Sequence, residues 1–184
     1  KVYDFIWDEF CDWYVETAKY RIYHKEEEKA AADCVLWVLK TVLKQALKLL
    51  HPFMPFITEE IYSVLVPEEE SLMMSEWPQF HAEWDFPAEE NVMEHVKEIT
   101  RGIRNMRAEM NVPNNRKTKV YVVCEDTEIC DGISTLENSI KPLMMAEKIL
   151  VQQTKENIAD NAVSVVVPDA VVYLPLEDLV DFEQ

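Results

Sequence analysis

The chain has 184 residues, of which 48% are hydrophobic and 10% aromatic, and its formal net charge at pH 7 is −17. This composition excludes a disordered or fibrous protein, and no apolar run of about eighteen residues predicts a membrane span. Only two glycines occur, so neither a P-loop nor a glycine-rich dinucleotide loop can be built. The four cysteines lack CxxC spacing and histidines placed to complete a zinc site, which predicts reduced thiols in a cytoplasmic protein.

The first two predicted elements are helices. Residues 2–21 place apolar side chains at helical spacing, which indicates a helix with one buried face. Residues 27–50 repeat apolar side chains every three or four positions, and this is the most regular helical pattern in the first half of the chain. Its opposite side carries a stripe of Lys40, Lys44 and Lys48, which we interpret as a solvated face.

A proline-containing corner follows. Pro52 disfavours helical geometry at His51, and Thr58 is predicted to cap the next helix with Glu59 and Glu60 in its positive first turn. That position explains the two carboxylates without a catalytic role. We expect His51 to bond to the backbone of the corner rather than to contact RNA or a metal.

The middle of the chain joins an irregular segment to a further helix. Residues 66–87 contain three prolines and show no sustained period, which predicts a connection pinned by Trp77 and Trp84. Between residues 88 and 110, apolar side chains step by three or four positions and indicate a helix with a single buried seam. Residues 97–119 carry seven basic and two acidic side chains, a local positive surplus in an acidic chain.

This positive surplus predicts a surface for an anionic ligand. The helical spacing of its members forms a ridge able to follow a phosphate backbone, and a basic loop over residues 114–119 continues the ridge. The alternative is a solvated loop beside a charged helix. The basic residues predicted to contact RNA here are Lys97, Arg101, Arg104, Arg107, Arg116 and Lys117.

The last third of the chain has the sequence pattern of a small α/β unit. Four runs rich in β-branched residues predict strands, with a short helix over residues 134–140 and a tight turn at Pro168-Asp169. We therefore expect a helical domain at 1–113 and an α/β subdomain at 114–184. The predicted strands are 120–124, 149–153, 163–167 and 171–174.

Three strings are more specific than any periodicity: CDWYVETAKYR at Cys11–Arg21, LLHPFMPFITEEIY at Leu49–Tyr62 and IRNMRAEMNVPNNRK at Ile103–Lys117. Their order resembles class I aminoacyl-tRNA synthetases specific for aliphatic amino acids, and valyl-tRNA synthetases most closely. The resemblance covers the whole chain. The isoleucyl and leucyl relatives usually differ around the second string and lack the third, and they remain the alternative within the class.

The resemblance implies a fold and a place in a longer protein. The helical domain is expected to be an α-helical bundle, the anticodon-binding domain, truncated at its start. The string LPLEDLVDFEQ at Leu174–Gln184 is expected to lead into an absent C-terminal coiled coil. The parent enzyme would join valine to tRNA(Val) using ATP and magnesium. The HIGH and KMSKS signatures do not occur in this chain, so we expect a catalytically inactive fragment without its own cofactor or metal.

The resemblance also implies RNA recognition by the first helix, because this domain contacts the anticodon stem-loop in the family. RNA loops are recognised through aromatic platforms, hydrogen-bonding side chains and cations. The predicted RNA-binding residues of this helix are Trp13, Glu16, Lys19 and Arg21. Each aromatic ring of the segment has the alternative of a place in the core.

Two other functions remain possible interpretations of the pattern. The acidic region 51–96, together with an apolar surface, would suit a helical protein-interaction module. A free-standing hydrolase lacks a nucleophile, base and orienting residue at any recognisable spacing. The expected partners are tRNA(Val) and the remainder of the synthetase. Self-association is expected across an apolar stripe near Val2 and Ile6, uncovered where preceding helices are missing.

Overall fold

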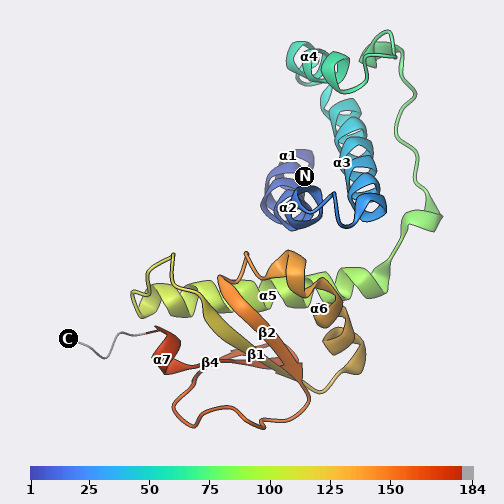
Figure 1. The fold of residues 1–184 in the computed structure, drawn as a ribbon. Coiled ribbons are helices and arrows are strands. Elements are labelled where there is room, and N and C mark those ends of the chain that lie inside the picture. The colour runs from blue at the N-terminus through green and yellow to red at the C-terminus, as the bar shows by residue number, and fades with distance from the viewer. Residues whose placement is uncertain (180–184) are drawn as a thin grey trace. The chain divides into compact units, whose positions relative to one another are not determined.

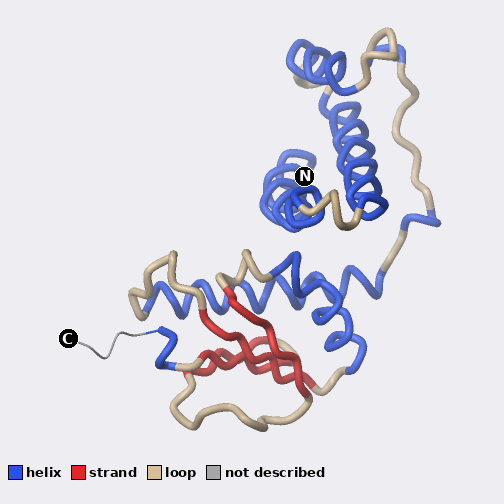
Figure 2. The backbone as a smooth tube through the Cα atoms, in the orientation of Figure 1, coloured by secondary structure: helices blue, strands red, loops and turns tan. Residues whose placement is uncertain are grey.

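The computed structural model describes residues 1–179, which belong to two compact units, residues 1–85 and the part of the chain from Phe86 onward. The first unit is helical, and the second combines helices with a small mixed sheet (Figures 1 and 2). The predicted succession of a helical part and an α/β part is confirmed at this level. The last five residues of the predicted coiled-coil lead, 180–184, lie outside the described residues.

The first unit begins with one continuous helical segment made of α1 (Val2–Asp4), η1 (Phe5–Val15) and α2 (Glu16–Tyr23). The sequence predicted this helix, but its central eleven residues are wound as a π-helix. Phe10, Trp13 and Ala18 lie on its buried side. Helix α3 (Lys29–Leu50) contacts this segment and also α4 (Pro55–Leu65).

The corner between α3 and α4 differs from the sequence prediction. Pro55 occupies the first turn of α4, where its fixed backbone angle and missing N–H are well tolerated, so the helix starts before Thr58. Thr58 is buried and is not a cap: its hydroxyl donates to the Met54 carbonyl at 2.8 Å. Since that hydroxyl has only one hydrogen, it accepts from His51 Nδ1, also at 2.8 Å. His51 therefore bonds to a side chain rather than to the backbone.

Glu59 and Glu60 consequently lie beyond the first turn of α4. Glu59 instead accepts a hydrogen bond from the backbone N–H of Leu72 at 3.0 Å. Leu72 begins the short helix η2 (Leu72–Met74), and its side chain packs with Leu47, Tyr62 and Val66 in a small core. The carboxylate thus ties the irregular connection to α4, which explains its position without a chemical role.

The remaining connection, which includes η3 (Ala82–Trp84), is pinned by only one of its two tryptophans. The Trp84 ring meets Trp37 of α3 edge-on, with centroids 6.3 Å apart. Trp77 is 56% exposed.

The second unit contains a four-stranded sheet of order β2-β1-β4-β3, in which β1 and β2 are parallel and the other neighbours antiparallel. All four predicted strands are confirmed. Helix α6 starts earlier than expected because Asp126 caps it, accepting from the N–H groups of Glu128 and Ile129. The elements are α5 (Pro87–Glu109), β1 (Thr118–Cys124), α6 (Thr127–Ile140), β2 (Ala146–Gln152), β3 (Val163–Val167), β4 (Ala170–Leu174) and α7 (Leu176–Leu179).

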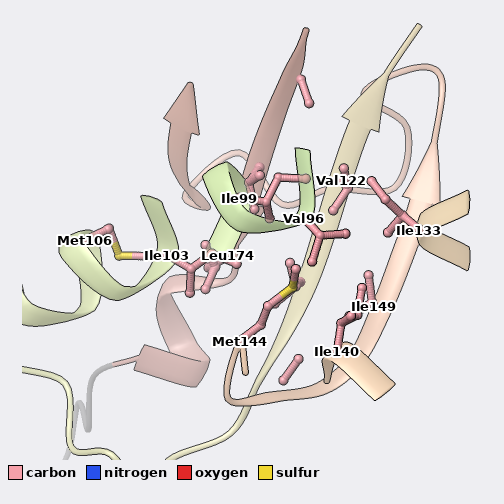
Figure 3. Close-up of a cluster of buried hydrophobic side chains, with 14 of the residues drawn as sticks. Val96, Ile99, Ile103, Met106, Val122, Ile133, Ile140, Met144, Ile149 and Leu174 are labelled. Carbon is pink, nitrogen blue, oxygen red and sulfur yellow. The ribbon is translucent and has the colours of Figure 1, made fainter. Parts of the chain in front are cut away.

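Helices α5 and α6 lie on one side of this sheet (Figure 1). The predicted apolar seam of α5 is confirmed, since Val96, Ile99 and Ile103 are fully buried in a core shared with the strands (Figure 3). Because that seam faces the sheet, α5 belongs to the α/β unit. The boundary between the units therefore falls at 85/86, which differs from the expected boundary after residue 113.

Three further findings concern residues 1–179. No helix in this range is long and apolar enough to cross a membrane. No group of three or more His, Cys, Asp or Glu side chains there is placed to hold a metal ion. The four cysteines are free thiols, as the sequence predicted.

Candidate nucleic-acid interface

The polar residues predicted on the first helix lie on α2 and are paired with acidic partners. Lys19 Nζ donates to the Glu16 carboxylate at 2.5 Å, and both side chains are more than 40% exposed. This bond raises the pKa of Lys19, so the amine stays charged. Arg21 lies 4.0 Å from Glu28, which follows α2. The predicted base acceptor and the predicted phosphate contacts thus lie within two turns of one helix, at the protein surface.

The aromatic residue predicted to contact RNA from this helical segment lies on its buried side and not at the surface. Trp13 is only 7% exposed and belongs to the buried side of the helix, so it presents no open ring face to an RNA base. The core interpretation holds for this ring, and Trp13 is withdrawn from the RNA-binding set. Tyr23, at the end of α2, is 76% exposed. The short, charged surroundings of Tyr23, from Lys19 to Glu28, were the signal that could have identified it.

The predicted basic ridge on α5 divides into exposed and buried members. Arg101 is half exposed and pairs with Glu98 at 2.6 Å. Arg104 is exposed, and its Nε donates to the Leu143 carbonyl at 3.2 Å. Lys97, by contrast, is 7% exposed and pairs with Glu94 at 2.6 Å. Helical spacing places these cations on one stripe of α5. Part of that stripe is buried, so only some of its members reach the surface.

Arg107 is the clearest correction to the predicted ridge. It is 3% exposed, and its Nη2 donates to the carbonyls of Pro113 at 3.0 Å and Arg116 at 2.6 Å. Burial lowers the pKa of Arg107. These two bonds fix the loop after α5, in which Asn111 adopts a positive φ of 53°. Arg107 therefore positions the basic loop, where Arg116 is partly buried and Lys117 exposed, instead of meeting a ligand itself.

The lysine stripe of α3 lies at the surface, where Lys40 is exposed, but its members bond to the connection that follows α4. Lys40 pairs with Glu68 at 3.3 Å, and Lys48 donates to the Glu76 carbonyl at 3.0 Å. Lys44 bonds to Glu69, which also accepts from the hydroxyl of buried Tyr62. The bonds from Lys44 and Tyr62 lower the pKa of the Glu69 carboxyl. The stripe thus holds the acidic connection against α3.

The exposed members of the predicted set form two surfaces, one on each compact unit. Glu16, Lys19 and Arg21 lie on the helical unit, whereas the other cations lie on α5 and the loop that Arg107 fixes. Each of the two surfaces combines cations with side chains able to accept or donate hydrogen bonds. Such surfaces suit a polyanion whose phosphates and base edges are both contacted.

The chain belongs to the family described as the anticodon-binding domain of tRNA ligase, which matches residues 1–122. The matched range includes the helical unit, α5, the basic loop and most of β1. Both candidate surfaces therefore lie within the part of the chain that matches an anticodon-binding domain.

Relatives that match the chain over its whole length indicate a particular kind of tRNA ligase. The chain is 42% identical over 187 residues to a valine–tRNA ligase of Clostridium tetani, covering 100% of this chain and 20% of the relative. The valine–tRNA ligase of Clostridium perfringens is 43% identical over 184 residues, again covering 100% of this chain and 21% of the relative. That of Carboxydothermus hydrogenoformans is 40% identical, with 100% and 20% covered. The chain thus spans about a fifth of the length of these relatives, and the predicted resemblance to valyl enzymes is confirmed.

Proposed function

We propose that this chain is the tRNA-binding region of a valine–tRNA ligase and that it contacts the anticodon stem-loop of tRNA(Val). The observation that carries the proposal is the family match over residues 1–122, joined to full-chain similarity with valine–tRNA ligases. The helices of the first unit would then form part of an anticodon-binding helical bundle. Joining valine to tRNA, with ATP and magnesium, would be the work of the remainder of a cytoplasmic enzyme, and this chain would be inactive alone.

In the proposed RNA contacts, an RNA phosphate replaces the carboxylate that pairs with each cation in the free protein. Lys19 and Arg101 each pair with a glutamate one turn away on the same helix and remain about half exposed. Exposed pairs of this kind contribute little to stability, so a phosphate can replace the carboxylate at little cost. The released Glu16 carboxylate can then accept from an exocyclic amine of a base. The proposed contact set is Glu16, Lys19, Arg21, Arg101, Arg104, Arg116 and Lys117.

The test is binding of the chain to tRNA(Val), to the same tRNA with an altered anticodon, and to an unrelated tRNA. We expect tightest binding to the first. Equal binding to all three would remove the recognition claim. Replacing Arg101 and Arg104 by glutamate should weaken binding to every RNA and flatten its salt dependence, as phosphate contacts require. Lys141→Glu, outside the proposed set, is the control for a single charge reversal in the same unit, to be compared with Arg101→Glu alone.

Salt also separates RNA binding from the protein-interaction alternative. Binding through several phosphates weakens steeply as salt rises, whereas an apolar protein interface responds little. An unchanged salt slope in the Arg101→Glu, Arg104→Glu variant would show that both arginines are merely solvated.

We also propose that the first helix takes part in self-association. The exposed large apolar side chains near its start are Tyr3 at 70%, Phe5 at 43% and Trp7 at 57%. Val2 and Ile6, the residues expected from the sequence, are partly buried. Large apolar side chains that gather on a surface favour association. Sedimentation at rising concentration tests this, and a strictly monomeric chain would contradict it.

A further inference from the structure

The two faces of the four-stranded sheet differ in what covers them. On β1, Thr118, Val120, Val122 and Cys124 are at most 1% exposed and point toward the core beneath α5 and α6. Side chains alternate along a strand, so the intervening residues of β1 lie on the other face, and strand register assigns their neighbours to the same face. This open face consists of Lys119, Tyr121, Val123, Lys148, Leu150, Gln152, Ser164, Val166, Val171 and Tyr173.

The composition of the open face is unlike that of the acidic chain around it. It contains two lysines and two tyrosines, and its acidic neighbour on β2 is Glu147, which is exposed at the bulge next to Lys148. Tyr121 and Tyr173 are directly paired across β1 and β4, and both are partly exposed. Directly paired residues on one sheet face have neighbouring side chains, so the two tyrosines lie side by side in the middle of the face. Val166 on the edge strand is 79% exposed.

Lysines lie on more than one side of these two tyrosines. Lys119 and Lys148 are register partners on β1 and β2, next to the tyrosine row, and both are exposed. Gln152 donates to the carbonyls of Thr154 and Glu156, which turns the chain after β2. Within that turn, Lys155 Nζ lies 5.1 Å from the centre of the Tyr173 ring.

The basic loop continues the end of the face at which Lys119 and Lys148 lie. Arg116 and Lys117 directly precede β1, and Arg107 holds their backbone by two hydrogen bonds. The opposite end of the sheet is acidic, because a cavity of about 610 Å³ there is lined by Glu125, Asp126 and Asp169. A polyanion is therefore attracted to the lysine end of the face and repelled from the other.

We propose that the open sheet face binds a single-stranded RNA segment, whose bases stack on Tyr121 and, in place of Lys155, on Tyr173, while its phosphates lie near Lys119 and Lys148. Aromatic side chains bind single strands because every base offers a flat face, and lysines neutralise the backbone. An acidic or neutral protein partner would match the lysines or the apolar residues but would gain nothing specific from a paired aromatic row. The inference rests on the proposed function only in taking RNA as the ligand.

The test uses the whole chain, a labelled oligoadenylate of about eight nucleotides, a length typical of such sites, and the anticodon stem-loop hairpin of tRNA(Val). Tyr121→Leu and Tyr173→Leu should each weaken oligoadenylate binding by about tenfold, the loss expected for one stacked base. Tyr121→Phe keeps the ring and should retain binding. Phe80→Leu, at an aromatic residue of the helical unit that is 84% exposed, is the matched control and should leave oligoadenylate binding unchanged.

The outcomes separate this inference from the proposed function. Oligoadenylate that fails to bind the unchanged chain, or binds the leucine variants equally well, would overturn the sheet-face inference. If the leucine variants lose the oligonucleotide while the chain binds cognate and altered tRNAs equally, the sheet inference stands and the anticodon proposal falls. Should a leucine variant unfold, Lys119→Gln with Lys148→Gln replaces it. This pair should lower the salt slope of oligoadenylate binding, and an unchanged slope would contradict the proposal.

Discussion

Gly102 allows α5 to lie directly on β3, and its replacement by alanine sets two energies against each other. Alanine stabilises a helix interior by about 1 kcal/mol relative to glycine. A Cβ at residue 102, however, would lie 2.7 Å from Val165 Cγ1 and 3.3 Å from Val167 Cγ1. Valine is stiff at χ1, so neither methyl can rotate away, and the helix or the strand has to move. Overpacking of this kind costs about 1–3 kcal/mol, which exceeds the gain in helix propensity.

We therefore expect Gly102→Ala to lower the free energy of unfolding by about 1 kcal/mol. A double-mutant cycle with Val165→Ala isolates the contact, because removing the Val165 methyl groups makes room for the new Cβ. In the Val165→Ala background, Gly102→Ala should cost less or become stabilising. Urea unfolding measures all four proteins, and Asn105→Ala, at an exposed position of the same helix, reports the propensity gain alone. A Gly102→Ala protein stabilised as much as Asn105→Ala, with no coupling to Val165, would refute the close packing.

Two further predictions concern buried charge and pH. Arg107→Met removes two hydrogen bonds to the basic loop, each worth about 1.5–3 kcal/mol from a charged donor. Because Arg107 Nε and Nη1 are buried without a hydrogen-bond partner among the described residues, their removal offsets part of the loss, and we expect a net destabilisation of about 1–3 kcal/mol in urea unfolding. Arg104→Met is the control, and equal stability of the two variants would contradict the clamp. The pKa of Glu69 is lowered in the folded state, so its contribution is complete above the unfolded pKa of about 4.3 and is lost as pH falls through the folded value. Melting curves of the natural chain and Glu69→Gln should therefore converge below about pH 4, and a constant difference down to pH 3 would rule out this role for Glu69.

The sequence predicted the helices and strands well where the signal is local. The apolar seam of α5 and the β-branched runs of the strands follow periods of about 3.6 and 2 residues, and each period is set by one element's own geometry. The period of a helix or strand does not show which other element it packs against. The seam of α5 packs on a sheet that follows it in the chain, and this contact places α5 in the α/β unit rather than with the helices before it.

The candidate site was harder to predict because burial and pairing decide which polar side chains are available. A stripe of cations on a helix has the same spacing whether it faces solvent, an acidic loop or a carbonyl. Lys97 and Arg107 are buried, and the stripe of α3 holds residues 68–76. Thr58 failed as a cap for a similar reason, since Pro55 provides an earlier start for α4. In each case a residue three or more positions away decides the outcome.

The net charge of −17 and the proposed affinity for RNA are compatible because charges act over a limited distance. At physiological ionic strength the screening length is about 8 Å, so acidic groups farther from a bound phosphate contribute little to the contact energy. Arg101 pairs with Glu98 on its own helix, and binding replaces one local anion by another. The remaining acids act on the approach of RNA, which they repel from every surface except the basic ones. Salt should therefore weaken this repulsion and the phosphate contacts together, and the slope measured for Arg101→Gln, which adds no acidic group, reports the loss of the Arg101 contact.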